Sequence, residues 1–302
     1  MVPWATLRRM SAPLPKTPDR PPIRRIGPEP DPGHHTGGLF ALWAHRRLVW
    51  TFVLNDLKQK YTGSSIGFFW TVITPLLELA TYTFVFHFVL GLRDGYGDGR
   101  AEWASYAIFL FCGMVTWSGI QEGIIRATTS IADHSHLIKK VNFHAITLPG
   151  YVVASALLNQ VIRLGVLLVF ILLATRGRMT WHLILVPPML ALQAAFVLGA
   201  GMMLATVSTY FKDTVHIVKA AMLLLMFVTP VFYGPEAYPP RLDLIKQLNP
   251  MSHLVGVYRQ LLINQELPDS RTFIIVTVIA AFSLLAGYSV FHHHQDRFAD
   301  HV

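Results

Sequence analysis

Two charged side chains stand inside long apolar runs of this sequence, where a charge must have a partner or a purpose. Glu78 and Arg163 each lie near the middle of such a run. Because a charge in hydrocarbon is costly, residues of this kind usually pair or line an aqueous path. We expect Glu78 to contact Arg163. In the alternative, each faces a cavity or polar neighbours, for which the candidates are Asn159, Gln160 and Gln193.

Aromatic side chains form a second group that could handle a substrate. The apolar run at 68–92 contains Trp70, Tyr82 and Phe86, of which the last two share a helical face. Aromatic rings pack against the apolar faces of sugar rings and still let them move, so these residues could line a path for a glycan. Contacts with lipid or with other helices would use the same residue types. The expected substrate-path residues are therefore Trp70, Tyr82, Phe86, Glu78 and Arg163.

Nucleotide and metal chemistry leave no signature in this sequence. The dipeptide Gly-Lys is absent, so there is no phosphate-binding loop, and there is no H-E-x-x-H motif. The single cysteine, Cys112, allows neither an internal disulfide nor a cysteine metal cluster. An acidic cluster for a divalent cation could come only from Asp94, Asp98 and Glu102, and the glycines between the two aspartates indicate a turn. We expect no catalytic site, no metal site and no cofactor in this chain, and we interpret the adjacent histidines at 292–294 as an interfacial cluster.

The elements that position these residues follow from composition. The chain has 302 residues, of which 53% are hydrophobic and 14% charged, whereas a soluble domain carries about 25% charged residues. Six apolar segments each reach the roughly 20 residues that a helix needs to cross hydrocarbon. These runs are too long for barrel strands, and lipid-exposed backbone must satisfy its own hydrogen bonds. The sequence thus predicts an all-α membrane protein with six transmembrane helices within 68–291, at about 68–92, 105–125, 148–175, 182–210, 214–234 and 272–291.

The segment before the first predicted span divides in two. Residues 1–36 are rich in Pro, Arg and Gly and have little to bury, so we expect a disordered tail that lacks the apolar core of a cleaved signal peptide. Within 37–67, apolar residues recur at helical spacing among basic ones, which predicts an amphipathic helix at 39–60 in the membrane interface. A soluble helix packed on a core is the alternative.

Lysine and arginine orient the predicted helices in the membrane. The N-terminal segment is the most basic region of a chain with a net charge of +8, and basic segments stay in the cytoplasm. An even number of spans then places the tail at 292–302 in the cytoplasm as well. In this orientation Glu122 and Arg126, four residues apart, lie at the inner end of the second span and are expected to pair. The positive charge fits an anionic membrane surface better than nucleic acid.

The last outer loop, about 235–271, is the longest connection between predicted spans. Its two apolar stretches, 242–248 and 251–263, follow prolines and are too short to cross a membrane. We expect two re-entrant half-helices that dip into the outer leaflet. A surface cap packed on the helix bundle is the alternative.

Four stretches of the chain, in order, resemble one family. Residues 60–76 read KYTGSSIGFFWTVITPL, and residues 137–150 read LIKKVNFHAITLPG. Residues 211–218 read FKDTVHIV, and 229–262 contain TPVFYGPEAYP, LNPMSHLV and YRQLL. Together they resemble the membrane subunits of type-2 ABC exporters, in the branch that exports polysaccharides, O-antigen and teichoic acid.

The resemblance covers about residues 40–291, with two departures from the family pattern. His144 stands where many members have Pro, and Lys212 stands where Arg is usual. The resemblance implies a homodimer with the glycan path between the two copies. It also implies two ATP-binding-cassette ATPase subunits beneath them, which carry the ATP and Mg²⁺.

The resemblance assigns roles to three regions. The helix at 39–60 is similar to the family's interface or gate helix, whose cations would attract an anionic lipid pyrophosphate headgroup. Its headgroup residues would be Arg46, Arg47, Lys58, Lys60 and Tyr61. The inner loop at about 128–142 is similar to the coupling helix that contacts the ATPase. Its residues would be Ile131, Asp133, His134, Leu137, Lys139 and Lys140. The half-helices are similar to the periplasmic gate, with Pro230, Tyr233, Asn249, Pro250, Tyr258 and Arg259.

These observations predict the transmembrane subunit of an ATP-driven exporter that moves a lipid-linked polysaccharide across the bacterial cytoplasmic membrane. The chain itself is expected to be no enzyme, because ATP hydrolysis belongs to a separate subunit. O-antigen, capsule, teichoic acid and cell-wall galactan are all open as substrates. Export of a drug or small lipid is the nearest alternative. A secondary transporter would predict internal repeats, which we do not find, and a membrane enzyme would need the acidic loop at 94–102.

Overall fold

The computed structural model describes residues 38, 40–91, 102–139, 144–174, 181–234 and 238–298. All regular structure within these residues is helical, so the prediction of an all-α protein is confirmed for them. The predicted tail at 1–36 lies outside the described residues, as do Asp94, Asp98, Lys140 and the last four residues.

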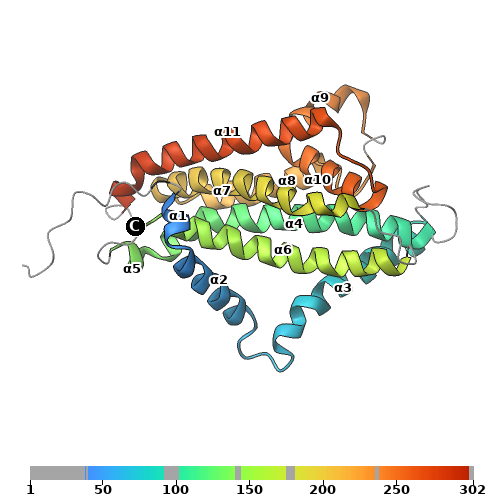
Figure 1. The fold of residues 1–302 in the computed structure, drawn as a ribbon, viewed down its shortest axis with the longest axis horizontal. Helices are drawn as coiled ribbons and strands as arrows, with labels where there is room; N and C mark the ends of the chain where they lie inside the picture. The colour runs from blue at the N-terminus through green and yellow to red at the C-terminus, as the bar shows by residue number, and fades with distance from the viewer. Residues whose placement is uncertain are drawn as a thin grey trace, which may run out of the picture. The chain divides into compact units, whose positions relative to one another are not determined.

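Four long helices run side by side (Figure 1). They are α4 (Glu102–Asp133), α6 (Thr147–Ala174), α7 (Val186–Tyr210) and α11 (Ser270–His294). Each is long and apolar enough to cross hydrocarbon. Helix α4 is central, because it packs against α6 and α7 and also against α8 (Thr214–Val228) and α10 (Pro250–Arg259). We call the end of the bundle at which α4 ends and α6 begins the inner end, and the opposite end the outer end.

Helix α4 extends beyond the predicted span at 105–125. It continues through Arg126 to Asp133, because a charged residue ends an apolar run without ending a helix, which takes Gly, Pro or a capping group. The predicted inner loop is correspondingly shorter. It contains the single-turn helix α5 (Ser135–Ile138) before the chain returns as α6.

The described bundle buries polar side chains and exposes apolar ones. Gln160 and Gln193 are fully buried between helices. Large apolar side chains on the outside of α6, α8 and α11 are exposed, among them Leu173, Leu224 and Phe282. Apolar faces of this extent need cover. Lipid supplies such cover, so the distribution agrees with a membrane protein.

Helices α7 and α11 approach each other most closely at two glycines. A Cβ atom at Gly287 would overlap the backbone of Gly199, and one at Gly199 would overlap the backbone of Ser283. Nearby, Ser283 Oγ donates a hydrogen bond of 2.9 Å to the carbonyl of Phe196. Small residues at this contact allow the two backbones to pack directly, as is common between membrane helices.

Helix α8 (Thr214–Val228) occupies most of the predicted span at 214–234 but ends earlier. The next residue, Thr229, has a ψ of 135° and is therefore extended. Pro230 follows, and a proline disfavours helical backbone at the residue before it. The chain then turns at 229–233 instead of continuing as a helix.

The predicted first span, 68–92, is built from two helical pieces. Helix α3 (Trp70–Tyr82) contains Pro75 and continues without a break as the π-helical segment η3 (Thr83–Val89). Thr83 Oγ1 donates a hydrogen bond of 2.7 Å to the carbonyl of Leu79, close to the change of helix type. Such a hydroxyl competes for the helix's own acceptors, and this competition often bends a helix.

The predicted amphipathic helix at 39–60 is divided into α1 (Phe40–Ala44) and α2 (Arg46–Tyr61). At the break, His45 leaves helical backbone, and its Nδ1 lies 2.9 Å from the carbonyl of Ala41. Helix α2 packs on α6 and buries Val53 completely. Trp50, on another side of α2, is 54% exposed. Helix α2 therefore has apolar side chains on the side that faces the bundle and also on a side that faces away from it.

The predicted outer loop is largely helical and packs on the outer end of α4 and α11. Asn249 caps α10 by accepting a hydrogen bond of 3.0 Å from the backbone of Met251. Tyr258 and Leu261 are fully buried in this contact. The elements of the loop are η6 (Pro240–Leu242), α9 (Asp243–Leu248), α10 (Pro250–Arg259) and the π-helical η7 (Gln260–Asn264).

Candidate functional site

A cluster of charges connects α2 to the inner half of α4. Arg126 Nη2 of α4 lies 2.6 Å from Asp56 Oδ1 of α2, and Arg126 Nη1 lies 3.4 Å from Glu122 Oε1. The predicted pairing of Glu122 with Arg126 is thus confirmed. The side chains of Arg126, Asp56 and Glu122 are 31%, 24% and 21% exposed, so the pairs are only partly screened by solvent.

Helix α6 completes this cluster. Ser155 Oγ donates a short hydrogen bond to Asp56 Oδ2, and Asn159 Nδ2 donates one of 2.9 Å to Glu122. Lys60, at the end of α2, brings its Nζ to 4.0 Å from Glu122. Charge-assisted hydrogen bonds of this kind are strong and directional, so the cluster fixes α2 against both α4 and α6.

The sequence analysis did not single out Asp56. It lies three residues after Val53 and four after Phe52, and both of these side chains face the bundle. An acid on the apolar face of a helix is the signal that could have found it, because residues three and four apart share a face. Its partner, Arg126, comes from another helix and is visible only in the fold.

The predicted headgroup residues lie mainly on the exposed side of α2. Arg46, Arg47 and Lys58 are exposed. Arg46 places its guanidinium 5.2 Å from the centre of the Trp43 ring and donates a hydrogen bond of 3.2 Å to the carbonyl of the same residue. Lys60 belongs instead to the charge cluster, and the side chain of Tyr61 lies outside the described residues.

The predicted coupling residues surround the end of α4. Ile131 is fully buried against Ala41, Phe291 and other apolar side chains, whereas Asp133 and Lys139 are exposed and Leu137 is half-buried. These residues lie at the inner end, around α5.

His134 joins α4 to α6 at this end. Its Nδ1 lies 3.0 Å from the carbonyl of Ser130, and its Nε2 lies 3.0 Å from the hydroxyl of Tyr151. The His134 and Tyr151 rings also meet edge to face, with centroids 5.5 Å apart. His134, which directly precedes α5, therefore contacts both long helices.

Arg163, one of the two charges predicted for the substrate path, has another partner than expected. No ion pair joins Glu78 and Arg163 among the described residues; Arg163 Nη1 instead donates a hydrogen bond of 2.6 Å to Ser118 Oγ of α4. The proposed polar alternatives have other partners, since Gln160 and Gln193 bond to each other at 2.6 and 3.0 Å. Ser118 was not predicted, because a single serine in an apolar run carries no signal of its own.

The aromatic path residues lie on α3 and η3. Trp70 Nε1 donates a hydrogen bond of 3.1 Å to Ser64 Oγ. Tyr82 is half-buried and packs against a cluster of Tyr106, Phe109 and Leu110 on α4. The side chain of Phe86 lies outside the described residues.

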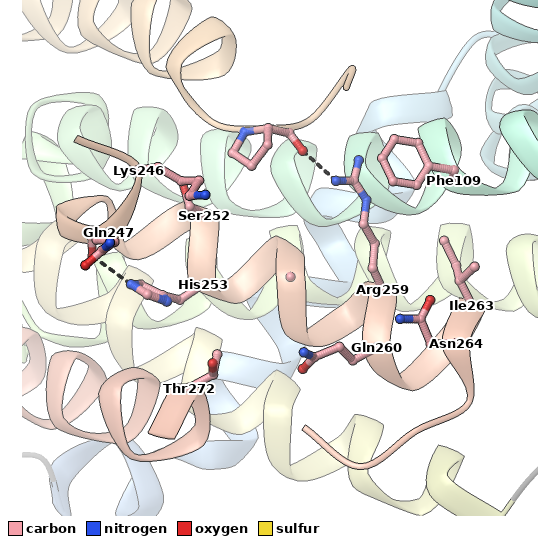
Figure 2. A pocket seen from close by; sticks show the side chains of 12 residues that line it. Phe109, Lys246, Gln247, Ser252, His253, Arg259, Gln260, Ile263, Asn264 and Thr272 are labelled. Atoms are coloured by element: carbon pink, nitrogen blue, oxygen red, sulfur yellow. Dashed lines mark hydrogen bonds between the residues drawn. The ribbon is translucent and has the colours of Figure 1, made fainter. Parts of the chain in front are cut away.

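The predicted outer-gate residues meet at the turn that follows α8. Arg259 donates hydrogen bonds of 2.6 Å to the carbonyls of Pro230 and Val231. Its guanidinium lies 3.6 Å from the centre of the Phe109 ring, and Figure 2 shows these two side chains next to each other. Arg259 is only 7% exposed. Irregular backbone at this depth must find hydrogen-bond donors, and Arg259 supplies two of them.

Three further contacts hold the same turn. Asn249 Nδ2 donates a hydrogen bond of 2.8 Å to Thr229 Oγ1, and Tyr106 donates one of 3.0 Å to the carbonyl of Phe232. Tyr233 donates one of 2.7 Å back to the carbonyl of Phe227 in α8. Pro250 begins α10, and Tyr258 is buried one residue before Arg259. The fold therefore brings the six predicted residues into one region.

Comparison with known proteins gives one family and several relatives. The model of the ABC-2 type transporter family matches residues 47–263, from α2 to η7. The O-antigen export system permease protein RfbA of Myxococcus xanthus is 30% identical over 86% of this chain and 97% of its own length. An RfbA protein of Klebsiella pneumoniae is 25% identical over 82% of this chain and 91% of its own. The capsule polysaccharide export inner-membrane protein CtrC of Neisseria meningitidis serogroup B is 21% identical, over 75% of this chain and 83% of its own.

Proposed function

The chain belongs to the ABC-2 type transporter family, and on this premise we propose that it is the membrane subunit of an exporter that moves a lipid-linked polysaccharide across the bacterial cytoplasmic membrane. The observation that carries the proposal is the similarity to an O-antigen export permease over 97% of that protein's length. A relative named for capsule export supports the same class of substrate. ATP hydrolysis would then belong to a separate ATPase subunit.

We propose six membrane crossings, with both termini in the cytoplasm. Four of the crossings are the long helices α4, α6, α7 and α11. The other two would be α3 with its continuation η3, and α8 with the turn that follows it. The excess of Lys and Arg before the first span supports the orientation. In this arrangement α9 would be the first of the two re-entrant half-helices in the outer leaflet, and α10 with η7 would be the second.

A second copy of the chain would complete the path. Large aromatic side chains are exposed directly before α3 and along η3, namely Phe69, Phe84 and Phe88 at 72%, 60% and 68%. A row of exposed rings can accept the apolar faces of sugar units that slide past them. We therefore propose that two copies face each other across this surface, with Trp70, Tyr82 and Phe86 on or beside the path.

The cytoplasmic half would convert ATPase movement into gating. The segment around α5 would receive the ATPase subunit, and His134 with Tyr151 would pass its movement to α4 and α6. Because Arg126 holds Asp56, α2 would follow α4. The exposed cations Arg46, Arg47 and Lys58 would attract the anionic pyrophosphate of the lipid carrier.

The turn held by Arg259 would form the exit. Its contacts to the carbonyls of Pro230 and Val231 tie the end of α8 to α10. Movement of α10 would therefore carry the end of α8 with it, so that the two elements would move together when the exit opens or closes.

Deletion of the gene in its host, followed by immunoblotting of surface glycan, tests the proposed function. We expect surface glycan to disappear, lipid-linked glycan to accumulate on the cytoplasmic face of the membrane, and a plasmid copy of the gene to restore export. Purification of the tagged chain should recover an ATPase subunit. Normal surface glycan combined with new sensitivity to a drug would contradict the proposal and favour the export of small molecules.

A further inference from the structure

A cavity of about 380 Å³ lies at the outer end, between α9, α10, η7 and the first turn of α11. Figure 2 shows Arg259 reaching from α10 toward Phe109, with Gln260, Asn264 and Thr272 on the other side of the helix. The amide side chains of Gln247 and Asn264 are exposed at its rim, and Ser252 is buried. The volume falls within the range of small-ligand sites, about 300 to 1,000 Å³.

The cavity lining includes a buried hydroxyl and a buried amide oxygen that have no hydrogen-bond partner in the part of the chain that the structure describes. They are Ser252 Oγ and Gln260 Oε1. A buried polar group without a partner is costly, so native structures rarely keep one unless a ligand or water supplies the missing bond. A hydroxyl can donate and accept, whereas an amide oxygen only accepts. The pair therefore suits a ligand that carries hydroxyl groups.

Gly256 leaves part of this space open. It lies in α10, between Ser252 and Gln260, and a Cβ atom added to it would meet no heavy atom within 4 Å. Glycine is less favourable than alanine inside a helix. At Gly199 and Gly287, close helix packing explains the glycine, but no such contact exists at Gly256. The empty space beside it belongs to the cavity.

The lining of the cavity combines apolar side chains with polar ones and contains no carboxylate. Lys246, at one side, already forms an ion pair of 2.7 Å with Asp243, whose pKa is lowered by hydrogen bonds from Lys246 and Gln247. A metal cation would find no acidic ligand among the lining residues, since hard cations require oxygen donors that are mostly carboxylates. Neutral amides and hydroxyls are instead the natural partners of neutral hydroxyl groups.

We propose that this cavity binds one sugar residue of the exported glycan as the chain leaves the membrane. The proposal rests on the proposed function and adds a site to it. The glycerol headgroup of an outer-leaflet phospholipid shares the hydroxyl chemistry. We favour the sugar because the exposed amides of Gln247 and Asn264 at the rim can bond to further hydroxyl groups of a sugar ring.

Ligand-observed NMR with the purified protein, in complex with its ATPase and held in nanodiscs, tests the proposal. The probes are free glucose, galactose, mannose, rhamnose and N-acetylglucosamine. We expect saturation transfer to at least one of them in the wild-type protein. Gly256→Leu starts from a position where an added Cβ meets no heavy atom within 4 Å, extends into the open space and should abolish that transfer. Gly165→Leu on α6, where an added Cβ also meets no neighbouring atom, should leave it unchanged.

A second pair of variants separates binding from folding. Ser252→Ala and Gln260→Leu each remove an atom that has no partner in the described structure, so neither should harm the fold. Each should weaken sugar binding by about tenfold, the usual effect of losing one ligand hydrogen bond. Transfer that persists in Gly256→Leu, or transfer to none of the sugars, would overturn the proposal.

Two preparations of nanodiscs distinguish the sugar from the lipid. Transfer should be equal in discs of phosphatidylcholine and in discs of phosphatidylglycerol. Transfer that disappears in phosphatidylglycerol would identify the lipid headgroup as the preferred occupant and overturn the proposal. If no sugar binds while deletion of the gene still abolishes surface glycan, the cavity site is wrong and the proposed function stands.

Discussion

Replacement of Arg126 by methionine should release α2 from the bundle. The substitution keeps the length of the side chain but removes the contact of 2.6 Å to Asp56 and the weaker one of 3.4 Å to Glu122. A hydrogen bond between charged groups contributes about 1.5 to 3 kcal/mol, and the exposed fractions of 21–31% reduce that contribution by solvent screening. We expect a loss of about 2 kcal/mol in the free energy that docks α2, which is roughly 30-fold in the docking equilibrium.

The rate at which a buried thiol reacts measures this equilibrium. Val53 of α2 is fully buried, so the thiol introduced by Val53→Cys reacts with N-ethylmaleimide only when α2 is undocked. In the Arg126→Met background, the labelling rate should rise by roughly 30-fold if labelling follows the open population. The native Cys112 of α4 is also fully buried and serves as an internal control, whose rate should stay constant.

A double-mutant cycle in the Val53→Cys background assigns the effect to the ion pair. Asp56→Asn alone should accelerate labelling of the introduced thiol, and adding it to Arg126→Met should accelerate labelling little further, because the interaction is already lost. Additive effects of the two substitutions, or a rate that changes less than about twofold in Arg126→Met, would refute the role given to this pair. Faster labelling of Cys112 would show instead that the whole bundle had loosened.

Three further substitutions test other contacts. Gly287→Val should separate α7 from α11 because its side chain overlaps the backbone of Gly199. The amount of folded protein recovered in detergent should therefore fall sharply. Gly165→Val, at a position where an added Cβ meets no neighbouring atom, should not lower this amount. Arg259→Lys keeps the charge but cannot reach two carbonyls in the same planar geometry. It should lower the free energy that holds the turn at 229–233 against α10 by about 2 kcal/mol, so that proteases cleave this turn faster. Unchanged proteolysis would count against the role of Arg259. Tyr151→Phe removes the hydrogen bond to His134 and should lower the amount of glycan transported per ATP hydrolysed while binding of the ATPase is retained. An unchanged ratio of transport to hydrolysis would show that this contact does not transmit the movement of the ATPase.

The long helices could be predicted because apolar length is a local property of the sequence. The described helices α4, α6, α7 and α11 each cover all or most of one predicted run. The ends of these helices were harder to predict, since α4 continues past Arg126 to Asp133 although its apolar run stops earlier. The early end of α8 has a local cause in Pro230, which the apolar pattern alone does not reveal.

The site was predictable only where its contacts are local. The pair of Glu122 and Arg126 follows from a spacing of four residues on one helix. The partner of Arg163 is Ser118, and the partner of Arg126 is Asp56, each from a helix that the sequence could not place beside it. In the same way, the sequence predicted Arg259 for the outer region without showing that it holds two backbone carbonyls of the turn at 229–233.

Reconstituted transport is the most direct test of the central claim, that this chain provides the membrane path and a separate ATPase provides the energy. Proteoliposomes that contain the chain, its ATPase and a fluorescent lipid-linked glycan should move the glycan across the bilayer only when ATP and Mg²⁺ are present. Vesicles with the chain alone should neither move the glycan nor hydrolyse ATP. Movement without the ATPase, or ATP hydrolysis by the isolated chain, would contradict the account.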